Sequence, residues 1–345
     1  MTSSVSAGGQ RAATIATIAT EVGVSVATVS KVLNGRADVA PETRARVEAS
    51  LERHRYRRRT RRTADAASQI HLVFHEFDSA WAMEIIRGVE EAATSAGVEL
   101  VLTQMGGMHR PSDTWLDLIV GRQPLGVLLV QCGLTPPQQE KLRRQRVPFV
   151  AVDTDSATPA SVPTVGSNNW NGGLIAARHL LELGHRRIAV ISGPEELLCS
   201  RARLAGFSSA HDEAGVAMDP ALVRHGTFYL NAGYEYGMEL LRLPEPPTAI
   251  FAGSDAQAMG VLRAARHLGL DLPGDLSVVG YDNLPVAEWM EPPLTTVHQP
   301  LHDMAAAATR MLLDLANGAE VPNSRIDLGT ELVVRASTAP PGAAR

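Results

Sequence analysis

The chain has 345 residues, a formal net charge of −5 and 45% hydrophobic residues. This length accommodates more than one domain with a sizeable core. Its two cysteines, Cys132 and Cys199, lack the spacing of a disulfide framework or of a metal site, so we interpret them as free thiols in a reducing cytoplasm. No stretch matches a signal peptide or a membrane span, which argues against a secreted or membrane-embedded protein.

Charge is distributed unevenly along the chain. Residues 1–63 contain 12 basic and 5 acidic residues, a net charge of +7, which leaves −12 for the rest. Residues 1–12 are small and polar and predict a disordered tail. A basic head on an acidic body indicates a polyanionic partner for the head alone.

Residues 14–34 predict two short helices joined by a tight turn. Thr14 and Ser25 stand where each helix needs an N-cap, and Gly23 ends the first helix because glycine adopts the left-handed conformation without steric cost. Apolar residues at helical spacing give each helix an inward face, with Ile15, Ile18, Ala19 and Val22 in the first and Val29, Val32 and Leu33 in the second. This arrangement is typical both of ordinary helical hairpins and of helix-turn-helix modules, whose second helix enters the major groove of DNA.

A family resemblance favours the helix-turn-helix alternative. The segment GVSVATVSKVLNG (23–35) resembles the signature of the lactose-repressor (LacI) family, and residues 41–44 open a third helix as in that family. Further landmarks follow in the family order, up to about Arg335: LELGHRRIAVISGP, RARLAGF, SVVGYDN and PPLTTVHQP. The resemblance implies a helix-turn-helix domain over 13–57, a hinge linker over 58–69, a two-lobed effector-binding and dimerisation domain over 70–338, and a disordered tail over 339–345.

The resemblance also implies roles in DNA binding. The first two positions of the recognition helix, Val26 and Ala27, would contact base edges through apolar groups such as thymine methyls, and Lys31 would donate to guanine. Neighbouring polar residues would contact phosphates, which positions the module without specifying a sequence. The complete predicted DNA-binding set is Thr14, Ser25, Val26, Ala27, Thr28, Ser30, Lys31, Asn34, Arg36 and Arg61.

The hinge linker departs from the family pattern. In the family this segment becomes a helix on operator DNA and a leucine wedges between base pairs, whereas Asp65 stands at that position here. The arginines from Arg57 to Arg62 would neutralise phosphates, either through non-specific attraction or by entering the minor groove, as we predict for Arg61.

From residue 69 onward, short apolar strands alternate with amphipathic helices. This alternation predicts parallel α/β sheets with helices on both faces. The family resemblance implies the fold class: doubly wound parallel sheets in a two-lobed, periplasmic-binding-protein-like (type I) domain whose chain crosses between the lobes three times. We place the first lobe at 70–164 and 294–323, and the second at 165–293 and 324–338.

Ligands of open parallel sheets bind at the carboxyl ends of strands, which face each other across the cleft of a two-lobed protein. Side chains near such ends, together with Arg203 in the RARLAG segment, form the predicted effector-binding set: Ser79, Trp81, Asp153, Arg203, Phe228, Ser254, Asp255 and Asp282. This set suits a mono- or oligosaccharide, because carboxylates accept hydrogen bonds from sugar hydroxyls, the guanidinium donates hydrogen bonds, and aromatic rings stack on the C–H faces of sugar rings. Structural alternatives exist as well, since Asp255 and Asp282 could cap the elements after their strands, and the aromatic residues could belong to the core.

The sequence therefore predicts a transcription repressor, a homodimer or a tetramer, that binds double-stranded operator DNA under the control of a sugar, with no cofactor, metal or catalytic residue. Alternatives within the family are a nucleobase or other non-sugar effector, and an effector that acts as co-repressor. A transport receptor would have a signal peptide and no basic head. An enzyme is disfavoured because the chain has no GxSxG, P-loop, metal-ligand cluster or dinucleotide-binding loop, although cleft carboxylates could form a glycosidase pair.

Overall fold

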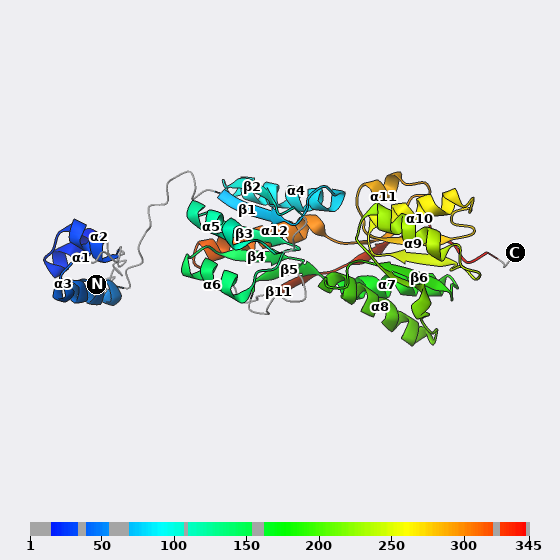
Figure 1. Ribbon diagram of the computed structural model, residues 1–345, viewed down its shortest axis with the longest axis horizontal. Helices are drawn as coiled ribbons and strands as arrows, with labels where there is room; N and C mark the ends of the chain where they lie inside the picture. Colours follow the sequence, from blue (N-terminus) through cyan, green and yellow to red (C-terminus); the bar gives the residue numbers. More distant parts are fainter. Residues whose placement is uncertain are drawn as a thin grey trace, which may run out of the picture. The chain divides into compact units, whose positions relative to one another are not determined.

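The computed structural model describes residues 15–33, 39–54, 69–106, 110–153, 162–319 and 325–342. They fall into two compact units, Met1–Arg62 and Thr63–Arg345. In Figure 1 the first unit contains the blue helices, and the second contains the elements coloured from cyan to red. None of the helices in these ranges is long and apolar enough to cross a membrane.

The first unit is a three-helix module built from α1 (Ile15–Val22), α2 (Val26–Leu33) and α3 (Pro41–Arg53). As predicted, Gly23 ends α1 with a φ of +71°, and the hydroxyl of Ser25 accepts from the N–H of Thr28 at 3.1 Å. Arg46 of α3 donates to the carbonyl of Val22, which ties α3 to the end of α1. The buried core of the module is formed by Ile18, Ala19, Val22, Val29, Val32, Val39 and Val47.

The second unit contains two six-stranded sheets, each in a lobe of its own (Figure 1). The first sheet has the order β11-β5-β4-β3-β1-β2, and its strands are β1 (Gln69–Phe74), β2 (Glu99–Gln104), β3 (Gly126–Val130), β4 (Phe149–Val152), β5 (Thr164–Ser167) and β11 (Arg325–Leu328). The second has the order β12-β10-β9-β8-β6-β7, and its strands are β6 (Ile188–Ser192), β7 (Val223–His225), β8 (Ala249–Ala252), β9 (Ser277–Asp282), β10 (Thr295–His298) and β12 (Glu331–Val333). Neighbouring strands pair in parallel, except that β12 is antiparallel to β10.

Helices cover both faces of each sheet, which confirms the predicted doubly wound fold. In the first lobe, α4 and α12 pack on one face, and α5 and α6 pack on the other. In the second lobe, α7 and α8 cover one face, and α9 and α10 cover the other. The helices of the unit are α4 (Ala80–Ser95), α5 (Asp113–Arg122), α6 (Pro136–Arg144), α7 (Asn169–Glu182), α8 (Leu198–Ala214), α9 (Leu230–Leu240), α10 (Asp255–His267), α11 (Val286–Trp289) and α12 (Leu301–Ala316), with a 3-10 turn at Pro220–Leu222.

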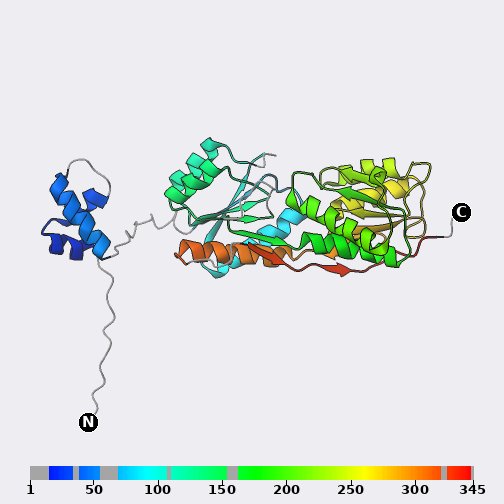
Figure 2. The same cartoon turned by 90° about the horizontal axis from the view of Figure 1, so that it is seen from below.

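The chain crosses between the lobes three times, after β5, after β10 and after β11; Figure 2 shows the third crossing in red. The predicted lobe boundaries are therefore wrong by several residues. Strands β5 and β11 pair with each other in the first sheet, whereas β10 pairs with β9 in the second, so the crossings lie near residues 168, 299 and 329. A buried strand has the same apolar pattern in either sheet, and the pattern does not reveal which sheet the strand joins.

The predicted C-terminal tail also begins too early. The N–H of Ala339 donates to the hydroxyl of Ser277 at 3.0 Å, and the same hydroxyl donates to the carbonyl of Ala339 at 3.0 Å. These bonds attach residue 339 to the first residue of β9, so the second lobe extends past the predicted boundary at 338.

Candidate functional site

Helix α2 presents the predicted base-reading residues at the surface of the first unit. Val26 is 51% exposed although it is apolar, and Ala27 and Lys31 are exposed as well. Ser25 is exposed and its hydroxyl lies 2.9 Å from that of Thr28, which is half-buried. Of the other predicted contacts, Ser30 is half-buried, and Thr14, Asn34, Arg36 and Arg61 lie outside the described residues.

Three side chains at strand ends in the second unit have an unusual backbone conformation. Gln131 follows β3 with a φ of +51°, Asp153 follows β4 with a φ of +52°, and Asp282 ends β9 with a φ of +108°. A left-handed backbone costs a residue with a side chain on the order of 1–3 kcal/mol, and such residues concentrate at functional sites. The carboxyl ends of both sheets thus carry strained polar residues, where the topology predicts a ligand.

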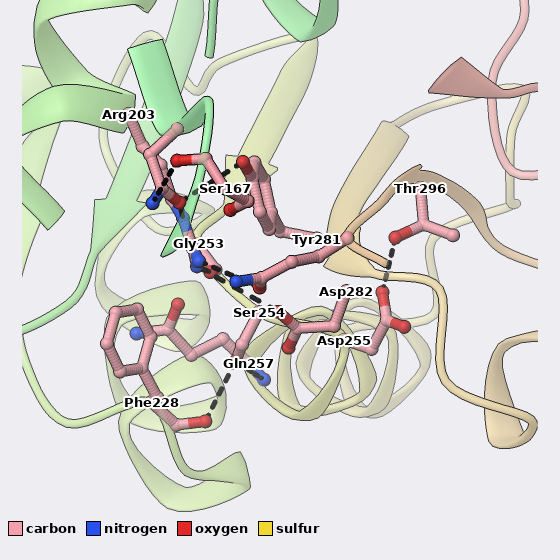
Figure 3. Close-up of polar contacts among 12 residues, drawn as sticks. Ser167, Arg203, Phe228, Gly253, Ser254, Asp255, Gln257, Tyr281, Asp282 and Thr296 are labelled. Atoms are coloured by element: carbon pink, nitrogen blue, oxygen red, sulfur yellow. Dashed lines mark hydrogen bonds and ion pairs between the residues drawn. The ribbon is translucent and has the colours of Figure 1, made fainter. Parts of the chain in front are cut away.

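Arg203 of α8 lies at the centre of this region and is only 4% exposed. Its Nε donates to Oδ1 of Asn169 at 2.8 Å, its Nη1 to the carbonyl of Gly253 at 2.6 Å, and its Nη2 to Oε1 of Gln299 at 3.2 Å. The guanidinium carbon lies 3.6 Å from the ring centroid of Tyr281, over the face of the ring. Each of the three guanidinium nitrogens therefore donates to an acceptor of the protein. Figure 3 draws Arg203 together with Gly253, Tyr281 and Asp282.

Two carboxylates accompany this guanidinium. Oδ1 of Asp282 lies 4.0 Å from Nη1 of Arg203. Burial raises the pKa of Asp282 well above its ordinary value, although the charge of Arg203 acts in the opposite direction. Burial also raises the pKa of Asp153, against the charge of Arg203 and hydrogen bonds from Gln131, Gln299 and Asn169. The site therefore holds one fixed positive charge among carboxyl groups that resist ionisation.

Asp153 has an unused acceptor. It is 6% exposed, and among the described residues its Oδ2 has no hydrogen-bond partner. A buried polar atom without a partner costs about 1–3 kcal/mol, so it indicates either a bound molecule or a functional role.

Ser254 and Asp255 have structural contacts, and their role as ligand contacts stays a prediction. Ser254 caps α10 by accepting from the N–H of Gln257 at 3.0 Å, and its hydroxyl donates to the carbonyl of Phe228 at 2.8 Å. Asp255 is fully buried, and its two oxygens accept from the hydroxyl of Thr296 at 2.6 Å and from the N–H of Leu284 at 2.7 Å. These bonds, drawn in part in Figure 3, hold the loop that carries Phe228 and the loop that follows Asp282.

The remaining predicted residues are placed differently. Phe228 lies beside the cluster, with its ring centroid 5.4 Å from the guanidinium carbon of Arg203. Ser79 is the N-cap of α4 and accepts from the N–H of Ala82 at 3.2 Å. Trp81 packs against the core of the first lobe, as its structural alternative predicts.

Sequence reasoning missed Asn169, Tyr281 and Gln299, which bond to or stack on Arg203. Gln299 comes directly after β10 and Asn169 two residues after the end of β5, so the rule that ligands meet strand ends could have found them. It also missed a bond between the lobes, in which the hydroxyl of Tyr229 donates to Oε2 of Glu76 at 2.7 Å. Two residues so distant in sequence give no pattern that pairs them.

The buried carboxylates give the stability of the second unit a pH dependence that can be measured. Burial raises the pKa of Asp255 from 3.8 to about 7, with hydrogen bonds from Thr296 and Leu284 acting in the opposite direction. Because this pKa is higher in the folded than in the unfolded state, the contribution of Asp255 to the unfolding free energy falls as pH rises from about 4 to about 7, by up to about 4 kcal/mol. Relative to the natural chain, Asp255→Asn should therefore be less destabilising at neutral pH than at pH 5.

Urea unfolding of both chains between pH 5 and pH 8 checks this expectation. The informative quantity is the difference in unfolding free energy between the two chains. Burial lowers the pKa of His71, His179, His185 and His211, so these histidines make both chains more stable as pH rises, and taking the difference removes their shared contribution. Asp314→Asn, at an exposed position of α12, is the matched control and should leave the difference flat. A flat difference for Asp255→Asn as well would contradict the expected effect.

No group of acidic, histidine or cysteine side chains in the described ranges is arranged to hold a metal ion. Cys132 and Cys199 are both buried free thiols, as predicted. Burial raises the pKa of Cys199 to about 12, so this thiol stays protonated beside the cluster.

Comparison with known proteins places this geometry in a family. Residues 14–59 match the model of bacterial regulatory proteins of the lacI family, and residues 177–338 match the periplasmic binding protein-like domain. The transcriptional repressor CytR of Escherichia coli is 33% identical over 335 residues, which cover 95% of this chain and 97% of CytR.

Solved structures give the same result. A complex of the transcriptional regulator CelR with cellobiose superposes with a TM-score of 0.72 at 34% identity, over 94% of this chain and 99% of CelR. The lac repressor dimer bound to operator and an anti-inducer superposes with a TM-score of 0.70 at 25% identity, over 95% of this chain and all of the repressor chain. The chain therefore belongs to the lacI family of bacterial regulatory proteins, as a DNA-binding transcription regulator that responds to a small-molecule effector.

Proposed function

We propose that this chain is a homodimeric transcription repressor, acting in the cytoplasm, whose affinity for operator DNA is set by an uncharged sugar bound between the two lobes. The observation that carries the proposal is the buried cluster around Arg203, in which the guanidinium is engaged by the protein while an oxygen of Asp153 has no partner among the described residues.

The hydrogen-bond donors and acceptors of the cluster select the class of effector. An anionic ligand, such as a sugar phosphate, would have to compete with Asn169, Gly253 and Gln299 for the guanidinium, because these residues already accept from three of its five N–H donors. A ligand rich in hydroxyls would instead donate to Asp153 and Asp282, and the ring of Phe228 offers an apolar face to its C–H groups. CelR, whose solved structure is a complex with cellobiose, supports a sugar effector by its similarity. We propose that the sugar is bound without chemical turnover.

The same contacts suggest how a bound sugar would act on the rest of the unit. Asn169 lies at the first crossing between the lobes and Gln299 at the second, and Arg203 donates to both. The third crossing is tied to the first, because the hydroxyl of Thr330 donates to the carbonyl of Asn168 at 3.2 Å. A sugar bound next to Arg203 would therefore favour one arrangement of the lobes over another.

In the DNA-bound state, two copies of α2 would occupy the major grooves of two half-sites, related by the two-fold axis of the dimer. We assign base contacts to Val26, Ala27 and Lys31, and phosphate contacts to the polar residues around them. A coupling of about 1–3 kcal/mol between sugar and operator is enough to change occupancy several-fold or more. The similarity to the lac repressor dimer bound to operator supports this assignment.

The test is a fluorescence anisotropy titration of a labelled duplex from the region upstream of the gene that encodes this chain. The full chain would be titrated at fixed salt, alone and with neutral mono- and disaccharides, with the matching sugar phosphates, and with nucleobases and nucleosides. We expect operator binding that resists competitor DNA and is weakened about 5- to 150-fold by one neutral sugar. By linkage, the operator must weaken binding of that sugar by the same factor.

Three results would overturn parts of the proposal. Release by a nucleobase or by a sugar phosphate alone would reject the neutral sugar. Tighter operator binding in the presence of the sugar would make the effector a co-repressor. Hydrolysis of aryl-glycosides that is lost in Asp282→Ala would show that the cleft is catalytic.

A further inference from the structure

A cavity of about 240 Å³ opens beside the first crossing, and both lobes line it. Asp153, Ser167 and Asp327 come from the first lobe, and Trp170 and Ala202 come from the second. This volume lies below the roughly 300–1,000 Å³ of pockets that hold a drug-sized ligand, and it suits a single ring. A larger hollow of about 430 Å³ lies over α6, but Glu140, Lys141 and Arg144 line it and none of the cluster residues does.

The lining of the cavity includes side chains with polar atoms that lack partners. Asp153 and Ser167 line it, and both side chains are more than nine-tenths buried; neither Oδ2 of Asp153 nor Oγ of Ser167 has a hydrogen-bond partner within the described part of the chain. Each such atom costs about 1–3 kcal/mol when nothing bonds to it. Both atoms are buried, so a ligand in the cavity would satisfy them once the two side chains turn toward it: its hydroxyls would donate to the carboxyl group and exchange a hydrogen bond with the serine.

The lining also combines an aromatic face with a charged pair. Trp170, in the first turn of α7, lines the cavity and is 43% exposed, which is unusual for so large an apolar side chain. From the other lobe, on β11, Nε of Arg325 donates to Oδ2 of Asp327 at 2.8 Å, and both side chains remain partly exposed. An aromatic face beside polar groups in fixed positions suits a sugar ring, which has C–H groups on its faces and hydroxyls at its edge.

The backbone that carries Trp170 is rigid. Helices α7 and α8 approach so closely that a Cβ on Gly206 would lie 1.8 Å from the carbonyl oxygen of Trp170. The opposite wall has no side chain at Gly166, where a Cβ would come within 3.1 Å of Oδ1 of Asp327. A fixed backbone beneath Trp170 reduces the ordering that a ligand must impose when it binds.

We propose that this cavity is the subsite for a second sugar ring, so that the effector is a disaccharide or a longer oligosaccharide. Trp170 provides the stacking face, and Arg325 and Asp327 contact the outer hydroxyls. The first ring binds at the Arg203 cluster, and Asp153 contacts both rings, since it lines the cavity and belongs to the cluster. This inference rests on the proposed function, because it specifies the size of the neutral sugar proposed above.

The test is isothermal titration calorimetry on the full chain. The probes are glucose, galactose, xylose and ribose, together with cellobiose, maltose, lactose and xylobiose. We expect one disaccharide to bind at least about 10-fold more tightly than its component monosaccharides. Trp170→Ala should remove that difference and leave the monosaccharide affinity within about 2-fold, whereas Trp170→Phe should keep most of it because the phenyl ring still stacks.

The chain offers a matched control in Trp289→Ala, since this tryptophan of α11 is 77% exposed and lies in another part of the second lobe. It should leave every affinity unchanged. Equal disaccharide affinity in Trp170→Ala and the natural chain would overturn the second subsite, as would a monosaccharide that binds as tightly as any disaccharide; the sugar effector itself would survive both results. A chain that binds no sugar of the panel but binds a nucleoside would overturn the proposed effector class together with the subsite.

Discussion

Replacing Arg203 by alanine is expected to lower the free energy of unfolding of the second unit by about 3–5 kcal/mol. The substitution removes three hydrogen bonds and the cation that faces Asp153 and Asp282. These carboxyl groups would then stay protonated over a wider pH range, and acceptors on Asn169, Gly253 and Gln299 would lose their donor. Urea unfolding followed by circular dichroism measures the change.

Arg201→Ala is the matched control, because Arg201 lies two residues earlier in the same helix and is exposed. It should change the unfolding free energy by no more than about 0.5 kcal/mol. Arg203→Lys should fall between the two variants, because an ammonium group restores the charge but cannot reproduce three donor directions or stack on Tyr281. A loss below about 1 kcal/mol in Arg203→Ala would mean that the cluster does not depend on its guanidinium, and the proposed link to both crossings would fail with it.

Local rules were sufficient to predict the elements of the fold. The N-cap at Ser25 and the helix end at Gly23 depend on neighbouring residues alone, and the structure shows both. Alternation of apolar strands and amphipathic helices likewise depends on short segments, and it led to the doubly wound class. The lobe boundaries failed because they depend on strand pairing, which joins segments far apart in the chain, as β5 and β11 show.

For the candidate site, too, local rules predicted some residues correctly and could not resolve others. The rule that ligands meet the carboxyl ends of strands directed attention to Asp153 and Asp282, and the structure brings both close to Arg203. It gave no way to separate a side chain that faces a cleft from one that holds a loop. Asp255 also comes directly after a strand, yet its oxygens accept from Thr296 and Leu284. That distinction depends on donors more than 25 residues away in sequence, and no local pattern encodes them.

The exposed face of α2 leads to the second large effect. Val26→Asp should weaken operator binding at least about 100-fold, because it replaces an apolar contact with base edges and places a negative charge among phosphates in both half-sites. The first unit should keep its fold, since Val26 lies on the surface. Anisotropy titration of the operator duplex at two salt concentrations measures the loss, and helical circular dichroism reports on the fold.

Two further variants separate DNA contact from folding. Ala49→Asp adds the same charge at an exposed position of α3 and should change operator affinity only a few-fold. Val29→Asp buries a carboxylate in the core of the module, so it should abolish specific binding by unfolding the first unit, which the loss of helical signal would reveal. If Val26→Asp bound operator as Ala49→Asp does, α2 would not be the helix that enters the major groove. We expect the opposite result, because the exposed Val26 begins α2, and the second helix of a helix-turn-helix enters the major groove with its N-terminal residues at the base edges.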